Sequence, residues 1–227
     1  MKVAVLQFPG SNCDQDALFA LREDCGVTAD YVWHENDSLA GFDAAFIPGG
    51  FSYGDYLRCG AMAARSPIMA EIHRFANEGR PVIGACNGFQ ILCETRILPG
   101  ALLLNRDQKF ICQDVFLKAE NKSSIWTSCN DQILRIPIAH GEGRFVIGDK
   151  VLKSLEDNDQ IAFRYVDAKG NASKEANVNG SVANIAGVLN LKGNVIGLMP
   201  HPERATKAPL GYGDGLAILK AFQLVLA

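Results

Sequence analysis

The sequence has no long hydrophobic run and no strong excess of one charge, and each absence excludes a class of protein. No apolar stretch among the 227 residues approaches the length of a membrane-spanning helix. The 22 lysine and arginine residues nearly balance the 25 aspartate and glutamate residues, for a formal net charge of −3, and they form no basic block. Binding to nucleic acid or to an anionic membrane surface is therefore not indicated, and small-molecule or protein partners are expected.

Motifs that would hold metals or nucleotides are also missing. The seven cysteines form no C-x-x-C pair and show no His/Cys ligand spacing, so neither a disulfide framework nor a metal site is predicted. No G-K-[ST] sequence follows a glycine-rich turn, so no nucleotide-phosphate cradle is predicted. The first residues, MKVAVLQFPG, predict a strand and lack a signal-peptide cleavage region, which favours a cytoplasmic location.

The composition that remains is that of a folded domain with alternating strands and helices. Hydrophobic residues make up 48% and charged residues 21%, and one domain is expected over residues 1–227. Apolar runs (KVAVLQF, ADYVWH, DAAFI, PVIGA) alternate with helical patterns (DQDALFALREDCG, RCGAMAARSPIMAEIHRFANEG). This alternation predicts the α/β class, with a doubly wound, mostly parallel, flavodoxin-like sheet and helices on both faces.

The pattern changes after residue 104. The runs KFICQDVFLKA, QILRIPIAHGEGRFVI and QIAFRYVD predict strands joined by short turns, without room for crossover helices, and hence an antiparallel excursion. A hairpin is then predicted to turn at Lys192, Gly193 and Asn194. The chain closes with a predicted helix, with Asp214 near its N-cap.

Cys86 lies where the run PVIGA gives way to a helical pattern. In an open α/β sheet, ligands bind beyond the carboxyl ends of the strands, and Cys86 is placed there. The sequence Gly84-Ala85-Cys86-Asn87-Gly88 has the small-x-nucleophile-x-Gly pattern of a nucleophile elbow, in which glycines permit a sharp turn. The free amides of the following helix favour negative charge on the sulfur, so Cys86 is the candidate nucleophile.

A nucleophilic cysteine needs a base, and the base needs an orienting group. His201, in MPHPER, follows the last core strand, and Glu203 stands two residues on, where it can accept from the imidazole. His140, in AHGEGRF, is the competing candidate, also with a glutamate (Glu142) two residues on, and ranks lower because it belongs to the excursion.

The other histidines and cysteines are given structural roles. His34 ends an early strand and His73 lies in a helical pattern, and neither has an obvious partner in the sequence. The six cysteines other than the nucleophile are expected to be small buried apolar residues. They are Cys13, Cys25, Cys59, Cys93, Cys112 and Cys129.

An acyl-transfer site also needs hydrogen-bond donors for the oxyanion of the tetrahedral intermediate. One donor is expected to be the backbone N–H of Asn87, which follows the nucleophile. The glycine-rich segment PGGFSYGDYLR, at the end of the third strand, is expected to supply the other through Gly50. A simple tight turn is the alternative interpretation of these glycines.

Together, GACNGFQ, MPHPER and PGGFSYGDYLR resemble the class I, or triad, glutamine amidotransferases. FPGSNCDQDA, ALLLNRDQKFICQDV and IPIAHGEGRF resemble the branch of that family that serves purine biosynthesis, and the resemblance covers nearly the whole chain. It implies that Cys86 is the nucleophile, His201 the base and Glu203 its orienter. It further implies that Gln90 helps to hold the substrate glutamine.

The resemblance also implies partners. A glutaminase of this branch hydrolyses glutamine and passes the ammonia to a synthetase subunit, in a complex with or without a small third subunit. The synthetase uses ATP and Mg²⁺ to convert formylglycinamide ribonucleotide to the amidine. No cofactor is therefore expected in this chain. The alternatives are a class I glutaminase subunit of another pathway, a non-catalytic regulatory subunit, and an independent cysteine hydrolase on a similar fold.

Overall fold

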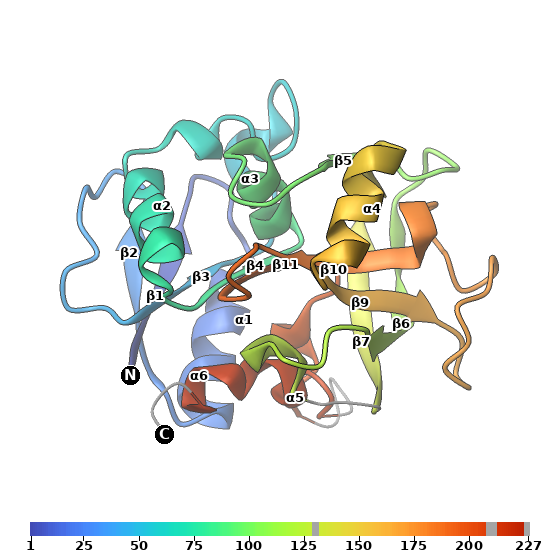
Figure 1. Ribbon diagram of the computed structural model, residues 1–227. Helices are drawn as coiled ribbons and strands as arrows, with labels where there is room; N and C mark the ends of the chain where they lie inside the picture. Colours follow the sequence, from blue (N-terminus) through green and yellow to red (C-terminus); the bar gives the residue numbers. More distant parts are fainter. Residues whose placement is uncertain (129–131, 208–212, 225–227) are drawn as a thin grey trace.

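The computed structural model describes residues 1–128, 132–207 and 213–224. Its main feature is a nine-stranded sheet with the strand order β2-β1-β3-β4-β11-β10-β9-β6-β7 (Figure 1). The strands are β1 (Lys2–Gln7), β2 (Thr28–Trp33), β3 (Ala44–Ile47), β4 (Val82–Ala85), β6 (Ile111–Ala119), β7 (Ile133–His140), β9 (Ile161–Val166), β10 (Ile185–Leu189) and β11 (Val195–Leu198). Strands β5 (Ala101–Leu103) and β8 (Arg144–Val146) form a separate antiparallel pair.

The direction of the strands divides the sheet into two parts. The neighbours from β2 to β11 pair in parallel, whereas β10, β9, β6 and β7 are added by antiparallel pairing. The α/β fold class is confirmed, together with the antiparallel excursion. The hairpin between β10 and β11 turns where it was predicted, with Gly193 at φ 70° and its N–H donated to the carbonyl of Asn190.

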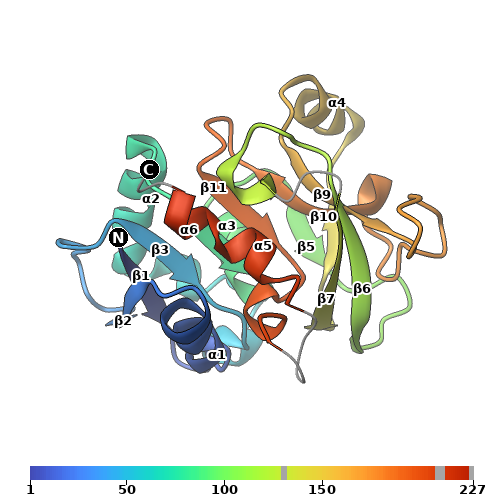
Figure 2. The same cartoon turned by 90° about the horizontal axis from the view of Figure 1, so that it is seen from below.

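Helices cover both faces of the sheet (Figures 1 and 2). α2 (Ile68–Glu78) and α3 (Asn87–Glu94) lie on one face. On the other lie α1 (Asp14–Phe19), which continues as a π-helical turn over Ala20–Asp24, and the C-terminal helices α5 (Leu216–Leu219) and α6 (Ala221–Leu224). No helix in the described parts of the chain is both long and apolar enough to cross a bilayer.

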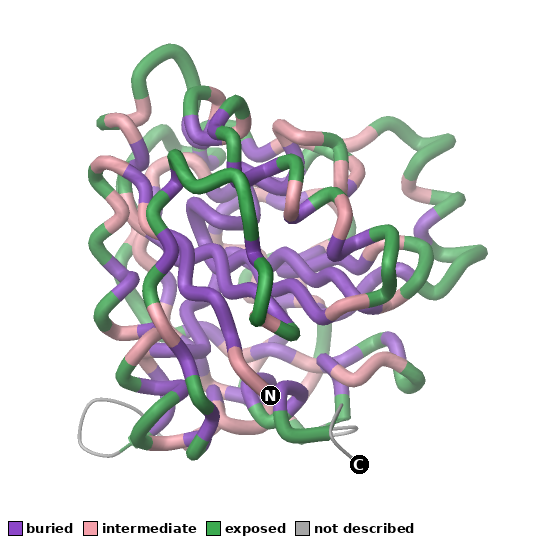
Figure 3. The backbone as a smooth tube through the Cα atoms, turned by 90° about the vertical axis from the view of Figure 1, so that its left-hand side faces the viewer, coloured by how far each residue is buried: buried purple, intermediate pink, exposed green. Residues whose placement is uncertain are grey.

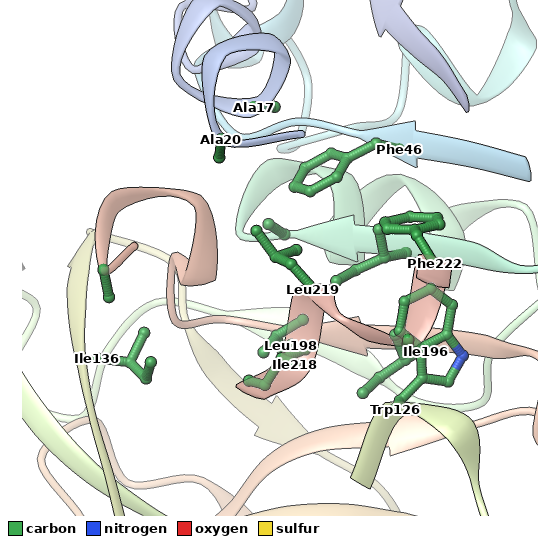
Figure 4. Close-up of a cluster of buried hydrophobic side chains, with 14 of the residues drawn as sticks. Ala17, Ala20, Phe46, Trp126, Ile136, Ile196, Leu198, Ile218, Leu219 and Phe222 are labelled. Carbon is green, nitrogen blue, oxygen red and sulfur yellow. The ribbon is translucent and has the colours of Figure 1, made fainter. Parts of the chain in front are cut away.

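The alternation of side chains along β4 divides the core into two clusters. Ile83 and Ala85 belong to the cluster beneath α1, α5 and α6, which also contains the edge-on pair Trp126 and Phe222 (Figure 4). Val82 belongs to the cluster on the other face, which packs against α2 and α3. Because both faces are covered, the central strands run through the buried interior (Figure 3).

Two helix predictions are corrected. The pattern expected to be helical from residue 58 onward forms only a 3-10 turn at Ala63–Arg65 before α2 begins at Ile68. The reason is Pro67: a residue before proline is disfavoured in the helical region, and Ser66 is extended, with ψ 145°. The excursion also contains α4 (Asp149–Asp157), where only turns were expected. Leu155 of α4 is buried, whereas the rest of the helix is mostly exposed.

The closing helix also differs from its prediction. It is divided into two short helices, α5 and α6, and residues 225–227 lie outside the described residues. Gly215 is the N-cap residue of α5, and no side chain caps this helix. The Asp214 carboxylate instead accepts from the backbone N–H of Arg135 at 2.7 Å, so it links the C-terminal segment to β7.

Candidate active site

Cys86 forms the sharp turn between β4 and α3. Its φ of 50° and ψ of −106° are unusual for a residue with a side chain, and its N–H donates to the Leu198 carbonyl of β11 at 2.8 Å. A Cβ atom on Gly88 would lie 2.0 Å from the backbone oxygen of Ile47, and one on Gly84 would lie 2.6 Å from the Gly88 oxygen. Glycine is therefore required on both sides of the turn, and the predicted elbow is formed.

His201 and Glu203 form a buried hydrogen-bonded pair just beyond β11. The imidazole Nδ1 lies 2.6 Å from Oε1 of Glu203, and the two residues are 2% and 4% exposed. The Nε2 atom of His201 is buried without a hydrogen-bond partner in the described part of the chain. Burial alone lowers the pKa of His201, but the Glu203 carboxylate and the Cys86 sulfur outweigh it and hold that pKa well above its usual value.

Gly49 shows how closely these groups pack. A Cβ atom at this position would lie 2.6 Å from Cε1 of His201 and 3.3 Å from the Cβ atom of Cys86. The ends of β3, β4 and β11 thus meet at one point, and only a glycine fits between the imidazole and the cysteine. The structure therefore brings Cys86, His201 and Glu203 together, in the chemical order of a nucleophile, a base and an orienting carboxylate.

The candidate oxyanion donors stand on both sides of this point. The carbonyl of Gly49 accepts from the N–H of Cys13 at 3.3 Å, which fixes the orientation of the Gly49–Gly50 peptide. A trans peptide points its N–H opposite its carbonyl, so the Gly50 N–H is directed away from Cys13. No hydrogen bond found among the described residues uses that N–H. The N–H of Asn87 is in the first turn of α3, where amides have no partner within the helix.

Gln90 is held by protein groups on both ends of its amide. Its Oε1 accepts from Nδ2 of Asn87 at 2.8 Å, and its Nε2 donates to the Glu142 carbonyl at 2.7 Å. The side chain is 5% exposed. Through these two hydrogen bonds, the Gln90 side chain links α3 to the turn after β7.

His140, the competing candidate base, lies beside the site, and its pKa is shifted in the direction opposite to that of His201. Asn105 Oδ1 accepts from the N–H of Gly143 and lies 3.0 Å from Nδ1 of His140, so Nδ1 must carry the proton. Burial, with a further effect from His201, lowers the pKa of His140 to about 4. Its Nε2 is buried without a partner among the described residues. His140 has an amide instead of a carboxylate on Nδ1 and is a weaker base, so the geometry favours His201.

Cys13 lies at the site although its neighbours in the sequence do not indicate it. It is 3% exposed, as expected, but its sulfur and ligating atoms of His201 and Glu203 all lie within 4.8 Å of one another. Among the described residues, these three are spaced closely enough to hold a metal ion. Glu203, however, already makes a hydrogen bond to Nδ1 of His201. No local motif could have revealed this contact.

The remaining cysteines divide into buried and exposed. Cys25, Cys59 and Cys93 are buried as expected. Cys112 is exposed, contrary to expectation, because it points outward from β6 near the edge of the sheet. Cys129 lies outside the described residues.

His34 does have partners, although its sequence context suggested none. Its Nδ1 lies 3.1 Å from the hydroxyl of Ser66 and 3.1 Å from the hydroxyl of Tyr53, which belongs to the segment following Gly50. His73, in contrast, is exposed on α2, as its helical pattern suggested.

Comparison with known proteins gives one family over most of the chain. The family described as the CobB/CobQ-like glutamine amidotransferase domain matches residues 1–209. The chain is 51% identical over 229 residues to phosphoribosylformylglycinamidine synthase subunit PurQ of Chlorobaculum parvum, covering 100% of this chain and 91% of that protein. It is also 51% identical to the protein of the same name from Methanosarcina barkeri, covering 97% and 96%.

Solved structures agree with the sequence comparison. A chain in the structure of PurLQS from Thermotoga maritima has a TM-score of 0.87 and 44% identity, covering 100% of this chain and 99% of that one. A glutamine amidotransferase from Thermotoga maritima has a TM-score of 0.56 at 16% identity, covering 91% of this chain and 77% of that one, which shows a shared fold alone.

Proposed function

The chain belongs to the CobB/CobQ-like glutamine amidotransferase family, and we propose that it is the glutaminase subunit of phosphoribosylformylglycinamidine synthase. The observation that carries this proposal is the 51% identity to PurQ proteins over essentially the full length of the chain. The grouping of Cys86, His201 and Glu203 at the strand ends supplies the chemistry that a glutaminase needs.

In the proposed reaction, the Cys86 thiolate attacks the carboxamide carbon of glutamine and forms a tetrahedral intermediate. His201 protonates the leaving nitrogen, ammonia departs, and a γ-glutamyl thioester remains on the sulfur. His201 then takes a proton from water, whose oxygen attacks the thioester and releases glutamate. Glu203 holds the imidazole by the Nδ1 hydrogen bond and stabilises its positive charge, consistent with the raised pKa of His201.

The oxyanion of each tetrahedral intermediate would accept from the backbone N–H groups of Gly50 and Asn87. Gly50 lies just after β3 and Asn87 begins α3, and the two segments meet at the nucleophile. Gln90 would contact the bound glutamine: its Oε1 accepts one hydrogen bond and its Nε2 donates one, which leaves one lone pair and one N–H of the amide for substrate.

The ammonia must be used before water protonates it, so a second active site has to receive it directly. We assign that site to a synthetase subunit that uses ATP and Mg²⁺ to activate formylglycinamide ribonucleotide, with or without a small third subunit. The similar chain from Thermotoga maritima belongs to a structure described as PurLQS. No cofactor is assigned to the present chain.

The buried state of the nucleophile suggests that docking of the synthetase controls the reaction. Cys86 is only 5% exposed, and Gln90 is engaged by protein groups. A displacement of about 1 Å can change a rate by about a hundredfold. We expect weak glutaminase activity in the isolated chain and a rise of at least about tenfold, about 1.4 kcal/mol of barrier, when the synthetase and its substrates are added.

The experiment that tests the proposal uses Cys86→Ser in the assembled complex. Synthesis of the amidine from glutamine should be lost, while synthesis from added ammonium salt should persist, because only the glutaminase half uses the thiolate. Cys112→Ser, which alters an exposed cysteine on β6, is the control and should retain both activities. Persistent use of glutamine by Cys86→Ser would refute the assignment of Cys86 as the nucleophile. If the parent complex makes no amidine from glutamine or from ammonium salt, the proposed role in phosphoribosylformylglycinamidine synthase is wrong.

A further inference from the structure

The segment that follows Gly50 has an unusual backbone. In residues 50–57, here called the Gly50 loop, three residues with side chains have positive φ: Tyr53 at 55°, Asp55 at 55° and Leu57 at 70°. L-residues rarely adopt this conformation, and it persists only where surrounding contacts hold it. The contacts of the Gly50 loop are therefore part of what places the Gly50 N–H.

Backbone hydrogen bonds attach the first half of the loop to the turn after β1. The N–H of Phe51 donates to the carbonyl of Gly10 at 3.0 Å, and the N–H of Tyr53 donates to the carbonyl of Pro9 at 2.6 Å. A third bond joins the loop to the elbow helix, because the N–H of Ser52 donates to Oδ1 of Asn87 at 3.2 Å. The segments that carry the two candidate oxyanion donors are thereby joined by a direct hydrogen bond.

The only side-chain hydrogen bond found for Tyr53 in the described part of the chain is the one to His34. Its hydroxyl lies 3.1 Å from Nδ1 and 3.5 Å from Nε2 of that imidazole. Of the residues that follow it in the loop, Tyr56 and Leu57 are 76% and 84% exposed, whereas Asp55 is half-buried and has a buried carboxylate oxygen. The Tyr53 hydroxyl thus ties the middle of the loop to His34, ahead of the exposed residues.

His34 is well suited to be an anchor because its own position is fixed. It is 6% exposed at the end of β2, where its N–H donates to the Gln7 carbonyl at 2.9 Å. Its carbonyl accepts from the N–H of Ile68 at the start of α2, and its ring stacks on Phe8 with centroids 5.9 Å apart. The Ser66 hydroxyl also lies 3.1 Å from Nδ1, so the hydroxyls of Ser66 and Tyr53 share that ring nitrogen.

We propose that the hydrogen bond between His34 and Tyr53 is a latch that positions the Gly50 loop for catalysis, and that both are positioning residues for glutamine hydrolysis. The inference rests on the proposed function, because the reaction supplies the role of the Gly50 N–H. Tyr53 is three residues from Gly50 and is held in a strained conformation. Without the latch, the loop relaxes towards ordinary backbone angles, and the amide leaves the place where the oxyanion forms.

The kinetic test replaces Tyr53 by phenylalanine, which removes only the hydroxyl. In the complex with the synthetase, kcat for glutamate release should fall about fivefold while KM for glutamine stays within about twofold, because the donor acts on the transition state. The matched control is Tyr56→Phe, the same change on an exposed residue of the same loop, and it should leave kcat unchanged.

A double-mutant cycle separates a latch from two independent effects. His34→Ala and Tyr53→Phe should be non-additive, with the double variant no slower than His34→Ala alone. Additive losses would show that the residues do not act through their mutual bond. Unchanged kcat in Tyr53→Phe, or an equal loss in Tyr56→Phe, would also overturn the proposal.

Hydrogen exchange tests the latch without any assay of activity. In the isolated full chain, peptides covering residues 50–57 should exchange faster in Tyr53→Phe than in the parent or in Tyr56→Phe. Equal exchange in all three proteins would refute the latch, whatever the kinetics. If the parent complex releases no glutamate, the proposed function fails, and the exchange experiment still decides whether the latch holds the loop.

Discussion

Acidification should destabilise the protein through His140, which is buried and neutral. Folding disfavours the charged form of this ring, because burial and the nearby His201 lower its pKa from 6.5 to about 4. A histidine with a lowered folded-state pKa contributes stability that is complete above the unfolded-state pKa. That contribution is lost as the pH falls from about 6.5 towards 4.

The size of the effect follows from the two pKa values. A shift from 6.5 to about 4 corresponds to about 3 kcal/mol when both states are fully protonated. At pH 5 most of the unfolded chains carry the proton on this residue and few folded ones do, so about 2 kcal/mol is already lost relative to pH 7.5. For a chain of this length, that corresponds to a fall in Tm of about 4–8 °C from His140 alone.

The assay is denaturant unfolding at pH 7.5 and pH 5, with the parent compared with His140→Asn. Asparagine places an amide N–H near the position of Nδ1, where it can still donate to Asn105, but it cannot titrate. The variant should lose about 2 kcal/mol less than the parent between the two pH values, whatever its stability at pH 7.5. His73→Asn, at an exposed site on α2, is the control and should follow the parent.

An equal fall in stability for the parent and His140→Asn would refute the reasoning. It would mean that the ring accepts a proton in the folded state, for example on the unpartnered Nε2, at little cost. If the fall in stability between pH 7.5 and pH 5 also disappears in His73→Asn, the measured change does not come from His140.

Four further substitutions test the geometry of the site. His201→Ala should reduce glutamine hydrolysis by more than about a thousandfold, and Glu203→Gln should reduce it less, because it weakens the base without removing it; steady-state glutamate release would show whether the order is reversed. Gly88→Ala should cost about 3 kcal/mol or more in unfolding experiments, since its Cβ would lie 2.0 Å from the backbone oxygen of Ile47. Gly49→Ala should keep the fold by circular dichroism yet lose more than about a hundredfold in hydrolysis, because its Cβ would lie 2.6 Å from the His201 ring; near-normal activity would contradict this packing.

Local patterns in the sequence were sufficient to predict the strands, the elbow and the hairpin. The buried strands are apolar throughout because helices cover both faces. Gly84 is required by its contact with Gly88 in the same turn, whereas Gly88 is required by Ile47 of the neighbouring strand β3. The His-x-Glu spacing of His201 and Glu203 is equally local, which is why their pairing was predicted and is present at 2.6 Å. Pro67 also determines where α2 begins, but the helix was predicted to start earlier because the residues before Pro67 have a helical pattern.

Tertiary structure alone decided which distant groups meet at the strand ends. Cys13 lies beside residues nearly 190 positions away, and Tyr53 bonds to an imidazole 19 positions before it. The proton on Nδ1 of His140 follows from an asparagine 35 residues earlier. Hydrophobic periodicity specifies which face of an element is buried, but not which polar side chains come within 3 Å once the elements pack. Those contacts depend on strand order, register and loop conformation together, so they determine the electrostatics and positioning of a site whose principal residues the sequence already indicates.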